Sequence, residues 1–165
     1  MSRYYEFFCP VKVIAGQAAL EHLPYELTGI ASTRPMIVTD QGVRSAGLLD
    51  PVISACQESD VTIAAIYDEV PPDSSTTMVR DIANLYRQQQ CDALIAIGGG
   101  SSIDTAKAVN ILVSEGGDDI AEYSGAGVLT RPLRPFFVIP TTAGTGSEVT
   151  SVAVIADRER SVKLP

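Results

Sequence analysis

The sequence predicts an α/β fold in which a parallel sheet is covered by helices on both faces. Short apolar runs of strand length alternate along the chain with longer segments whose apolar residues recur at helical spacing. The apolar run at residues 93–97 also passes through three consecutive glycines into a helical pattern that begins at Ile103. Such a succession of strand, turn and helix is the repeating unit of parallel α/β sheets.

The length of 165 residues and the net charge of −8 set the first bounds on function. This length suits one domain with its own core. The negative charge argues against nucleic acid and membrane surfaces as partners, because both would repel it. No apolar run approaches the ~20 residues of a membrane span, and the N-terminal M-S-R-Y-Y-E lacks a signal peptide's apolar core. We expect a cytoplasmic protein that acts on small molecules.

The N-terminal part of the chain is predicted to begin with extended runs at residues 4–8 and 12–15, which Pro10 separates. Residues 17–30 have helical spacing that Pro24 interrupts, and this predicts two short helices or one broken helix.

The next elements alternate. Residues 36–39 form a predicted buried strand that ends at Asp40, and the helix predicted over residues 48–58 has Pro51 in its first turn, where proline is tolerated. Residues 61–67 are the following predicted strand.

The loop at residues 68–75 is too rich in turn-forming residues for regular structure. The clearest helical pattern follows over residues 76–90, with Ser74 or Ser75 available to cap it. The helix after the glycines is predicted to end near residue 113.

The C-terminal part is predicted to hold a loop at residues 116–127 with a helical turn at 120–123. A buried strand at residues 136–139 leads into a threonine- and glycine-rich loop, and an apolar run covers residues 152–156. The sequence has no internal repeat and no low-complexity tract.

Three loops are predicted to share one crevice. Asp40, residues 98–101 and residues 141–146 each follow an apolar strand. In a parallel sheet, ligands bind in the crevice beyond the carboxyl ends of the strands, so all three loops should line that edge.

The glycine turn is predicted to bind a phosphate group. Gly98, Gly99 and Gly100 lack Cβ atoms, so the backbone can approach a bulky anion, and the helix that follows offers free N–H groups and a positive dipole end. A capping box between Ser101 and Asp104 is compatible with this, because a cap uses only some donors. A tight turn without a ligand is the alternative. The pattern is neither a Walker loop nor G-x-G-x-x-G.

Asp40 is a candidate ligand of an adenosine ribose, whose two hydroxyls a carboxylate at this position accepts. The same charge would repel a 2′-phosphate, which predicts NAD over NADP. The alternative is a turn-forming aspartate before Gly42. The loop T-T-A-G-T-G-S-E at residues 141–148 offers hydroxyl groups and allows close backbone approach. It is predicted to form a second wall for the nucleotide, and a plain loop is the alternative. Lys107 lies two turns into the helix that follows the glycines, and it is interpreted as a solvated surface residue.

Cysteine and histidine are sparse. Cys9, Cys56 and Cys91 are far apart and lack C-x-x-C spacing, which predicts reduced core thiols. His22 is the only histidine and is predicted to lie on a surface helix. The chain therefore cannot assemble a multi-histidine metal site from its own residues.

Three motifs together resemble the iron-containing (group III) alcohol dehydrogenases. They are G-G-G-S-S-I-D-T-A-K at residues 98–107, I-P-T-T-A-G-T-G-S-E-V-T at 139–150 and V-T-D at 38–40. The resemblance implies a Rossmann-like, dehydroquinate-synthase-like fold in which residues 1–165 are the NAD-binding domain. It also implies that the family's helical domain, which holds Fe²⁺ or Zn²⁺, is absent from this chain.

Carried over by position, the resemblance implies a set of cofactor contacts and no catalytic or metal-binding residue in this chain. The implied contacts are Asp40 at the adenine-side ribose, Gly98, Gly99, Gly100 and Ser101 at the pyrophosphate, Thr141 and Thr142 near the adenine and phosphates, Asp104, Ser147 and Val149 towards the nicotinamide, and Lys163 at a cofactor ribose.

The implied activity of the full-length enzyme is hydride transfer between a primary or small alcohol or aldehyde and NAD(H). The 165 residues alone are expected to be inactive. A nucleotide-binding module without catalysis is an alternative, as is a glycerol dehydrogenase, a glycerol-1-phosphate dehydrogenase or a dehydroquinate synthase-like lyase of the same fold. The resemblance also implies a homodimer, or another self-associated form, through residues 4–15.

Overall fold

The computed structural model describes residues 9–125, 127–157 and 162–164. Its centre is a four-stranded sheet in the order β2-β1-β3-β4, and all neighbouring strands are parallel. The strands are β1 (Pro35–Val38), β2 (Ala65–Tyr67), β3 (Ala93–Gly98) and β4 (Phe136–Pro140). The predicted α/β class is confirmed.

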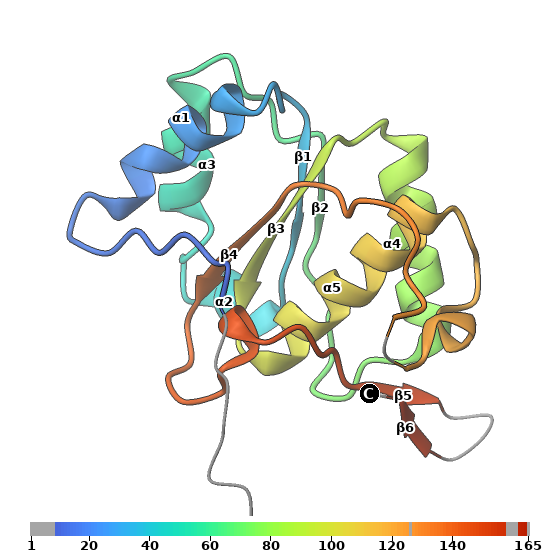
Figure 1. Ribbon diagram of the computed structural model, residues 1–165. Helices are drawn as coiled ribbons and strands as arrows, with labels where there is room; N and C mark the ends of the chain where they lie inside the picture. The colour runs from blue at the N-terminus through green and yellow to red at the C-terminus, as the bar shows by residue number, and fades with distance from the viewer. Residues whose placement is uncertain (1–8, 126, 158–161, 165) are drawn as a thin grey trace, which may run out of the picture.

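Helices cover both faces of the sheet, as Figure 1 shows. One face packs against α4 (Thr76–Gln88) and α5 (Gly100–Glu115), and the other against α1 (His22–Gly29) and α3 (Asp50–Gln57). Strand β3 divides its side chains between these two cores, because successive residues of a strand point to opposite faces. Leu94 and Ala96 join one core, whereas Ala93, Ile95 and Ile97 join the other.

Burial on both faces explains why β3 has an uninterrupted apolar sequence. All six of its residues are buried, and a parallel strand covered on both sides has no solvent face that would favour polar residues at alternate positions. The glycine turn and α5 therefore follow a strand that is buried along its whole length.

The helices begin and end for local reasons. Ser75 caps α4, since its hydroxyl accepts the Met78 N–H at 3.3 Å. At the far end of α5, Gly116 adopts the left-handed conformation with φ of +89°. The predicted helix at residues 76–90 is thus confirmed, with two fewer residues at its C-terminal end.

Several predicted boundaries in the first half are wrong. Residues 12–15 form no strand, and residues 4–8 lie outside the described part of the chain. The strand expected at residues 61–67 is assigned only to its last three residues, although the Thr62 N–H already donates to Thr33 O at 2.8 Å. A short helix, α2 (Gln41–Ser45), was not predicted, because five residues show no periodicity.

Other elements agree with the sequence. Residues 17–30 form a 3₁₀ turn at Ala19–Glu21 followed by α1, which has Pro24 in its first turn. The helical turn Ile120–Tyr123 is present. Near the C-terminus, a 3₁₀ turn at Ser147–Val149 precedes a ribbon of β5 (Ile155–Asp157) and β6 (Val162–Leu164). Among the described helices, none has the length and apolar character that crossing a membrane demands.

Candidate functional site

The order of the strands creates a crevice between β1 and β3. From β1 the chain continues to β2 on one side, whereas β3 lies on the other side of β1 and continues to β4. At such a switch point the loops after the two central strands diverge to opposite faces and leave a gap beyond their carboxyl ends. Asp40 lies two residues after the end of β1 and Gly99 follows β3 directly, so the two predicted loops flank this gap.

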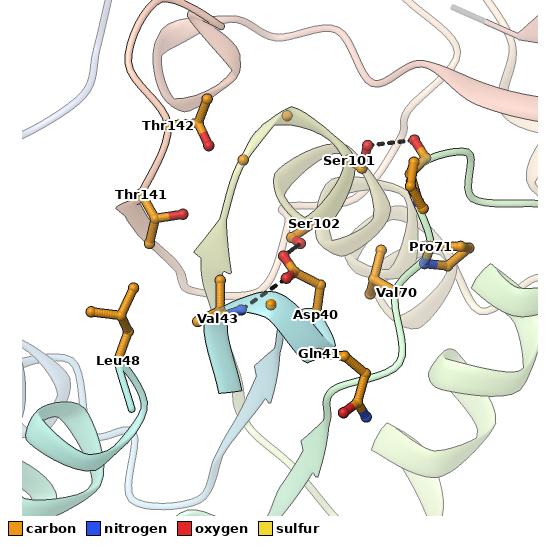
Figure 2. A pocket seen from close by; sticks show the side chains of 14 residues that line it. Asp40, Gln41, Val43, Leu48, Val70, Pro71, Ser101, Ser102, Thr141 and Thr142 are labelled. Atoms are coloured by element: carbon orange, nitrogen blue, oxygen red, sulfur yellow. Dashed lines mark hydrogen bonds between the residues drawn. The ribbon is translucent and has the colours of Figure 1, made fainter. Parts of the chain in front are cut away.

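A cavity of about 710 Å³ occupies this edge of the sheet. Each of the four strands contributes to its walls, through residues 40–43 after β1, 70–72 after β2, 99–102 after β3 and 141–142 after β4. Figure 2 shows Asp40 and Ser102 between the β1 and β3 loops, with Thr141 and Thr142 on the wall beyond. The three loops predicted to share one crevice therefore meet there. The loop at 70–72 was not among them, although it too follows a strand.

The N-terminus of α5 is open towards the cavity. Gly99 is its N-cap residue, no side chain caps it, and its first turn contains no acidic residue. The first N–H groups of a helix have no partner within the helix, and they carry the positive end of its dipole. Residues 99–102 line the cavity, so these donors are available to an anion there.

Contacts inside the protein also favour glycine at positions 98 and 99, whereas a Cβ on Gly100 would make only ordinary van der Waals contacts. Gly98 has φ of +149°, and a Cβ atom there would lie 2.6 Å from Ser102 Oγ. A Cβ on Gly99 would lie 3.0 Å from Thr142 Oγ1, and one on Gly100 would lie 3.4 Å from Ser147 Oγ. The turn is therefore packed against neighbouring protein atoms, and the helix N-terminus beside it stays open to a ligand.

The predicted capping box is wrong. Ser101 lies inside the helix, and its hydroxyl donates to Pro72 O at 2.5 Å, which holds the loop after β2 against α5. Asp104 instead accepts the Val154 N–H at 3.2 Å through Oδ2. Both partners are distant in sequence, so local spacing could not reveal them.

Asp40 has the structural role that was its alternative interpretation, and it lines the cavity as well. It is the N-cap of α2, with Oδ1 accepting the Val43 N–H at 3.0 Å. Its other oxygen, Oδ2, accepts the Ser102 hydroxyl at 3.0 Å. A contact with a ribose stays a prediction.

Lys107 is held by protein groups, so its interpretation as a solvated residue is wrong. Its side chain is 13% exposed, and Nζ donates to Val152 O at 2.8 Å and to Thr150 Oγ1 at 3.1 Å. Asp104 Oδ1 lies 3.6 Å from Nζ. Burial lowers the pKa of Lys107, and the Asp104 carboxylate opposes this shift.

The remaining predicted site residues lie outside the cavity. Asp104 borders a smaller cleft beside Ser101, and Ser147 is buried near Gly100. Val149 lines a groove beside β4. Lys163 belongs to β6, and the position of its side chain is not described.

Among the described residues, Cys56 and Cys91 belong to the two cores as predicted, whereas Cys9 is half-buried and joins neither core. Cys9, Cys56 and Cys91 are free, and Cys56 is buried. Desolvation raises the pKa of Cys91 to about 11. His22 is exposed at the start of α1. Within the described residues, no group of three or more His, Cys, Asp or Glu side chains is placed to hold a metal ion.

The fold and the crevice define a Rossmann-like α/β domain. The sequence profile of the family described as iron-containing alcohol dehydrogenase matches residues 10–165, and the chain belongs to this family. The resemblance found in its motifs is thereby confirmed.

Relatives and solved structures agree with this assignment. The chain is 40% identical over 159 residues to an NAD-dependent methanol dehydrogenase of Bacillus methanolicus, covering 96% of this chain and 41% of the relative. It is similar to the crystal structure of a 1,3-propanediol oxidoreductase, with a TM-score of 0.91, 33% identity and coverage of 98% and 42% of the two chains.

A second structural neighbour was solved with a cofactor. It is a sulfoacetaldehyde reductase from Bifidobacterium kashiwanohense in complex with NAD⁺, with a TM-score of 0.85 and 28% identity, covering 99% of this chain and 43% of the neighbour. The chain thus spans about two fifths of the length of the relatives that it matches.

Proposed function

We propose that this chain is the NAD-binding domain of a metal-dependent alcohol dehydrogenase that transfers hydride between a primary or small alcohol or aldehyde and NAD(H). The observation that carries the proposal is the uncapped N-terminus of α5, which faces a cavity at the switch point of a parallel sheet with Asp40 across from it. The names of the relatives, among them an NAD-dependent methanol dehydrogenase, support it.

The walls of the cavity suit the two polar parts of an adenine dinucleotide. The free N–H groups after Gly99 would bind the pyrophosphate, with Gly98, Gly100 and Ser101 shaping the turn. The Asp40 carboxylate would accept the hydroxyls of the adenosine ribose. Thr141 and Thr142 would form the opposite wall.

The nicotinamide half would extend beyond this cavity. We assign Asp104, Ser147 and Val149 to its surroundings, and Lys163 to a ribose hydroxyl. Ser147 packs beside Gly100, whereas Val149 lines the groove beside β4. These contacts rest on the family motifs.

The described residues do not fit a catalytic metal, since no three potential ligand side chains gather anywhere among them. We propose that Fe²⁺ or Zn²⁺ is held by a helical domain elsewhere in the full-length natural polypeptide. The residues of the present chain would bind and orient NAD, whose nicotinamide accepts or donates the hydride.

Calorimetry and a substrate panel on the full-length natural polypeptide test this function. We expect NAD⁺ to bind more tightly than NADP⁺, and NAD⁺ to be reduced with small alcohols when Fe²⁺ or Zn²⁺ is present. Tight NAD⁺ binding without turnover of any alcohol would favour a binding module. Failure of the folded protein to bind NAD⁺ would contradict the proposal.

Two broader properties belong to the same proposal. We propose that the protein is cytoplasmic and that it self-associates, as a homodimer, through residues 4–15. Self-association is supported by Val11, Val13 and Ile14, which are 45%, 72% and 38% exposed beside the edge strand β4. The charge of −8 supports small-molecule partners over nucleic acid or anionic membranes.

A further inference from the structure

Ser102 is buried between the two loops that flank the switch point. It is the third residue of α5 and is 1% exposed. Its hydroxyl does not cap the helix but donates across the crevice to Asp40 Oδ2 at 3.0 Å, as Figure 2 shows. The bond joins residues 62 positions apart in the sequence, and it connects the loop after β1 to the helix after β3.

The Asp40 carboxylate is fixed from both sides. Val43 N–H donates to Oδ1 at 3.0 Å, opposite the Ser102 hydroxyl on Oδ2. Two glycines leave just enough room: a Cβ on Gly42 would lie 3.0 Å from Oδ1, and one on Gly98 would lie 3.0 Å from Oδ2. We call these four residues, Gly42, Val43, Gly98 and Ser102, the Asp40 clamp.

The clamp leaves part of the carboxylate available to a ligand. An ionised carboxylate has about four acceptor sites, and the described partners are one donor on each oxygen. Asp40 also lines the cavity. The remaining acceptor sites can therefore receive two vicinal hydroxyl groups while the protein holds the carboxylate still.

Ser102 also fixes the distance between the two polar subsites. The first turn of α5 supplies both the free N–H groups for a phosphate and the hydroxyl that holds Asp40. A ligand that binds both must match one spacing between its phosphate and its diol. Binding is stronger when such groups are already in place, because less freedom is lost on association.

We propose that Ser102 is a positioning residue that holds the Asp40 carboxylate for the ribose hydroxyls and thereby sets the preference for NAD over NADP. This inference rests on the proposed NAD function. Without the Ser102 hydroxyl, the carboxylate keeps only the Val43 N–H and can turn away from the ribose. It would then bind the diol less well and repel a 2′-phosphate less strongly.

The test is calorimetry of NAD⁺ and NADP⁺ binding to the full-length natural polypeptide carrying Ser102→Ala. We expect the Kd for NAD⁺ to rise about tenfold, as for the loss of one well-placed hydrogen bond to a charged group. The ratio of the NADP⁺ Kd to the NAD⁺ Kd should fall. Ser114→Ala is the matched control, because Ser114 is a buried serine at the other end of α5, and its hydroxyl donates to Asn110 Oδ1. It should leave the ratio unchanged.

A double-mutant cycle separates positioning from direct contact. In a protein that already carries Asp40→Gly, Ser102→Ala should leave the Kd ratio unchanged, because no carboxylate remains to be positioned. An equal effect with and without Asp40 would mean that Ser102 touches the ligand itself, and would overturn the proposal.

The outcomes also distinguish this inference from the function on which it rests. If the unmodified protein does not bind NAD⁺, both fail. If it prefers NAD⁺, Asp40→Gly abolishes the preference and Ser102→Ala does not change it, only the role of Ser102 fails. Should Ser102→Ala not fold, Gly42→Ala perturbs the carboxylate from its other oxygen at an exposed helical position. An unchanged ratio in Gly42→Ala would contradict the fixed carboxylate.

Discussion

At the scale of single residues, Asp40 combines two interpretations that the sequence presented as alternatives. It begins α2 as an N-cap, and it presents its carboxylate to the cavity. A capping aspartate holds its own side chain in place, because the cap bond orients the carboxylate. The turn role and the ligand role are therefore compatible.

Substituting Asp40 by Asn and by Gly separates the charge from the cap. Asn is as good a cap as Asp, so Asp40→Asn should keep most of the stability while it relieves repulsion of a 2′-phosphate. Asp40→Gly removes cap, charge and the Ser102 contact together. We expect both variants to lose discrimination against NADP⁺ by about 1–3 kcal/mol, because both lack the charge that would repel a 2′-phosphate and accept charged hydrogen bonds from the ribose hydroxyls.

Calorimetry measures the two cofactor affinities, and thermal unfolding measures the stability. Unchanged affinities for NAD⁺ and NADP⁺ in both variants would reduce Asp40 to a turn residue. Loss of folding in Asp40→Asn would instead show that the charge itself is structural.

At the scale of elements, the unit formed by β3, the glycine turn and α5 needs glycine at position 98 for internal packing. This requirement is separate from the access of a ligand to the turn. The φ of +149° at Gly98 suits glycine, and the side chains of Ser102 and Asp40 occupy the space into which a Cβ would point. A side chain there would push against Ser102 and Asp40, both members of the same crevice. The first glycine of the turn therefore maintains the geometry of the site.

Gly98→Ala should destabilise the protein by about 2–4 kcal/mol, combining backbone strain with overpacking. Gly16→Ala is the matched control. Gly16 has a similar φ of +144°, but nothing lies within 4 Å of the Cβ position. It should therefore show the backbone strain alone.

Denaturant unfolding of the two variants gives the comparison. A destabilisation of Gly98→Ala no larger than that of Gly16→Ala would mean that Ser102 and Asp40 move aside without cost, and would argue against a tightly fixed carboxylate.

Sequence patterns predicted the elements that are stabilised by local interactions or are fully buried. The continuous apolar run of β3 and the amphipathic α4 were both identified, because burial on two faces or on one face leaves a clear pattern. The short α2 was missed, since its N-cap Asp40 was interpreted as a ligand or a turn residue and its five residues show no periodicity. Interactions between distant segments, such as Ser101 with Pro72, leave no mark in local spacing.

At the scale of the whole molecule, the two edges of the sheet differ in the segments that lie beside them. Strand β2 forms one edge, and β4 forms the other, where residues 10–15 run beside it. The residues of both edge strands keep some exposure, in contrast to the buried β3. Unpaired strand edges with apolar neighbours favour pairing with another chain. The segment at 10–15 is therefore the place to test self-association.

Val13→Asp should shift the full-length natural polypeptide towards the monomer in analytical ultracentrifugation. Val13 is 72% exposed, so the substitution has little effect on the fold of one subunit, but a buried unpaired carboxylate in an interface is costly. Ile66→Asp is the control, because Ile66 is a 39% exposed apolar residue of β2, at the opposite edge of the sheet. A monomeric unmodified protein at high concentration, or equal dissociation by both substitutions, would contradict an interface at residues 4–15. Dissociation by Val13→Asp alone would place the interface at this edge, next to β4.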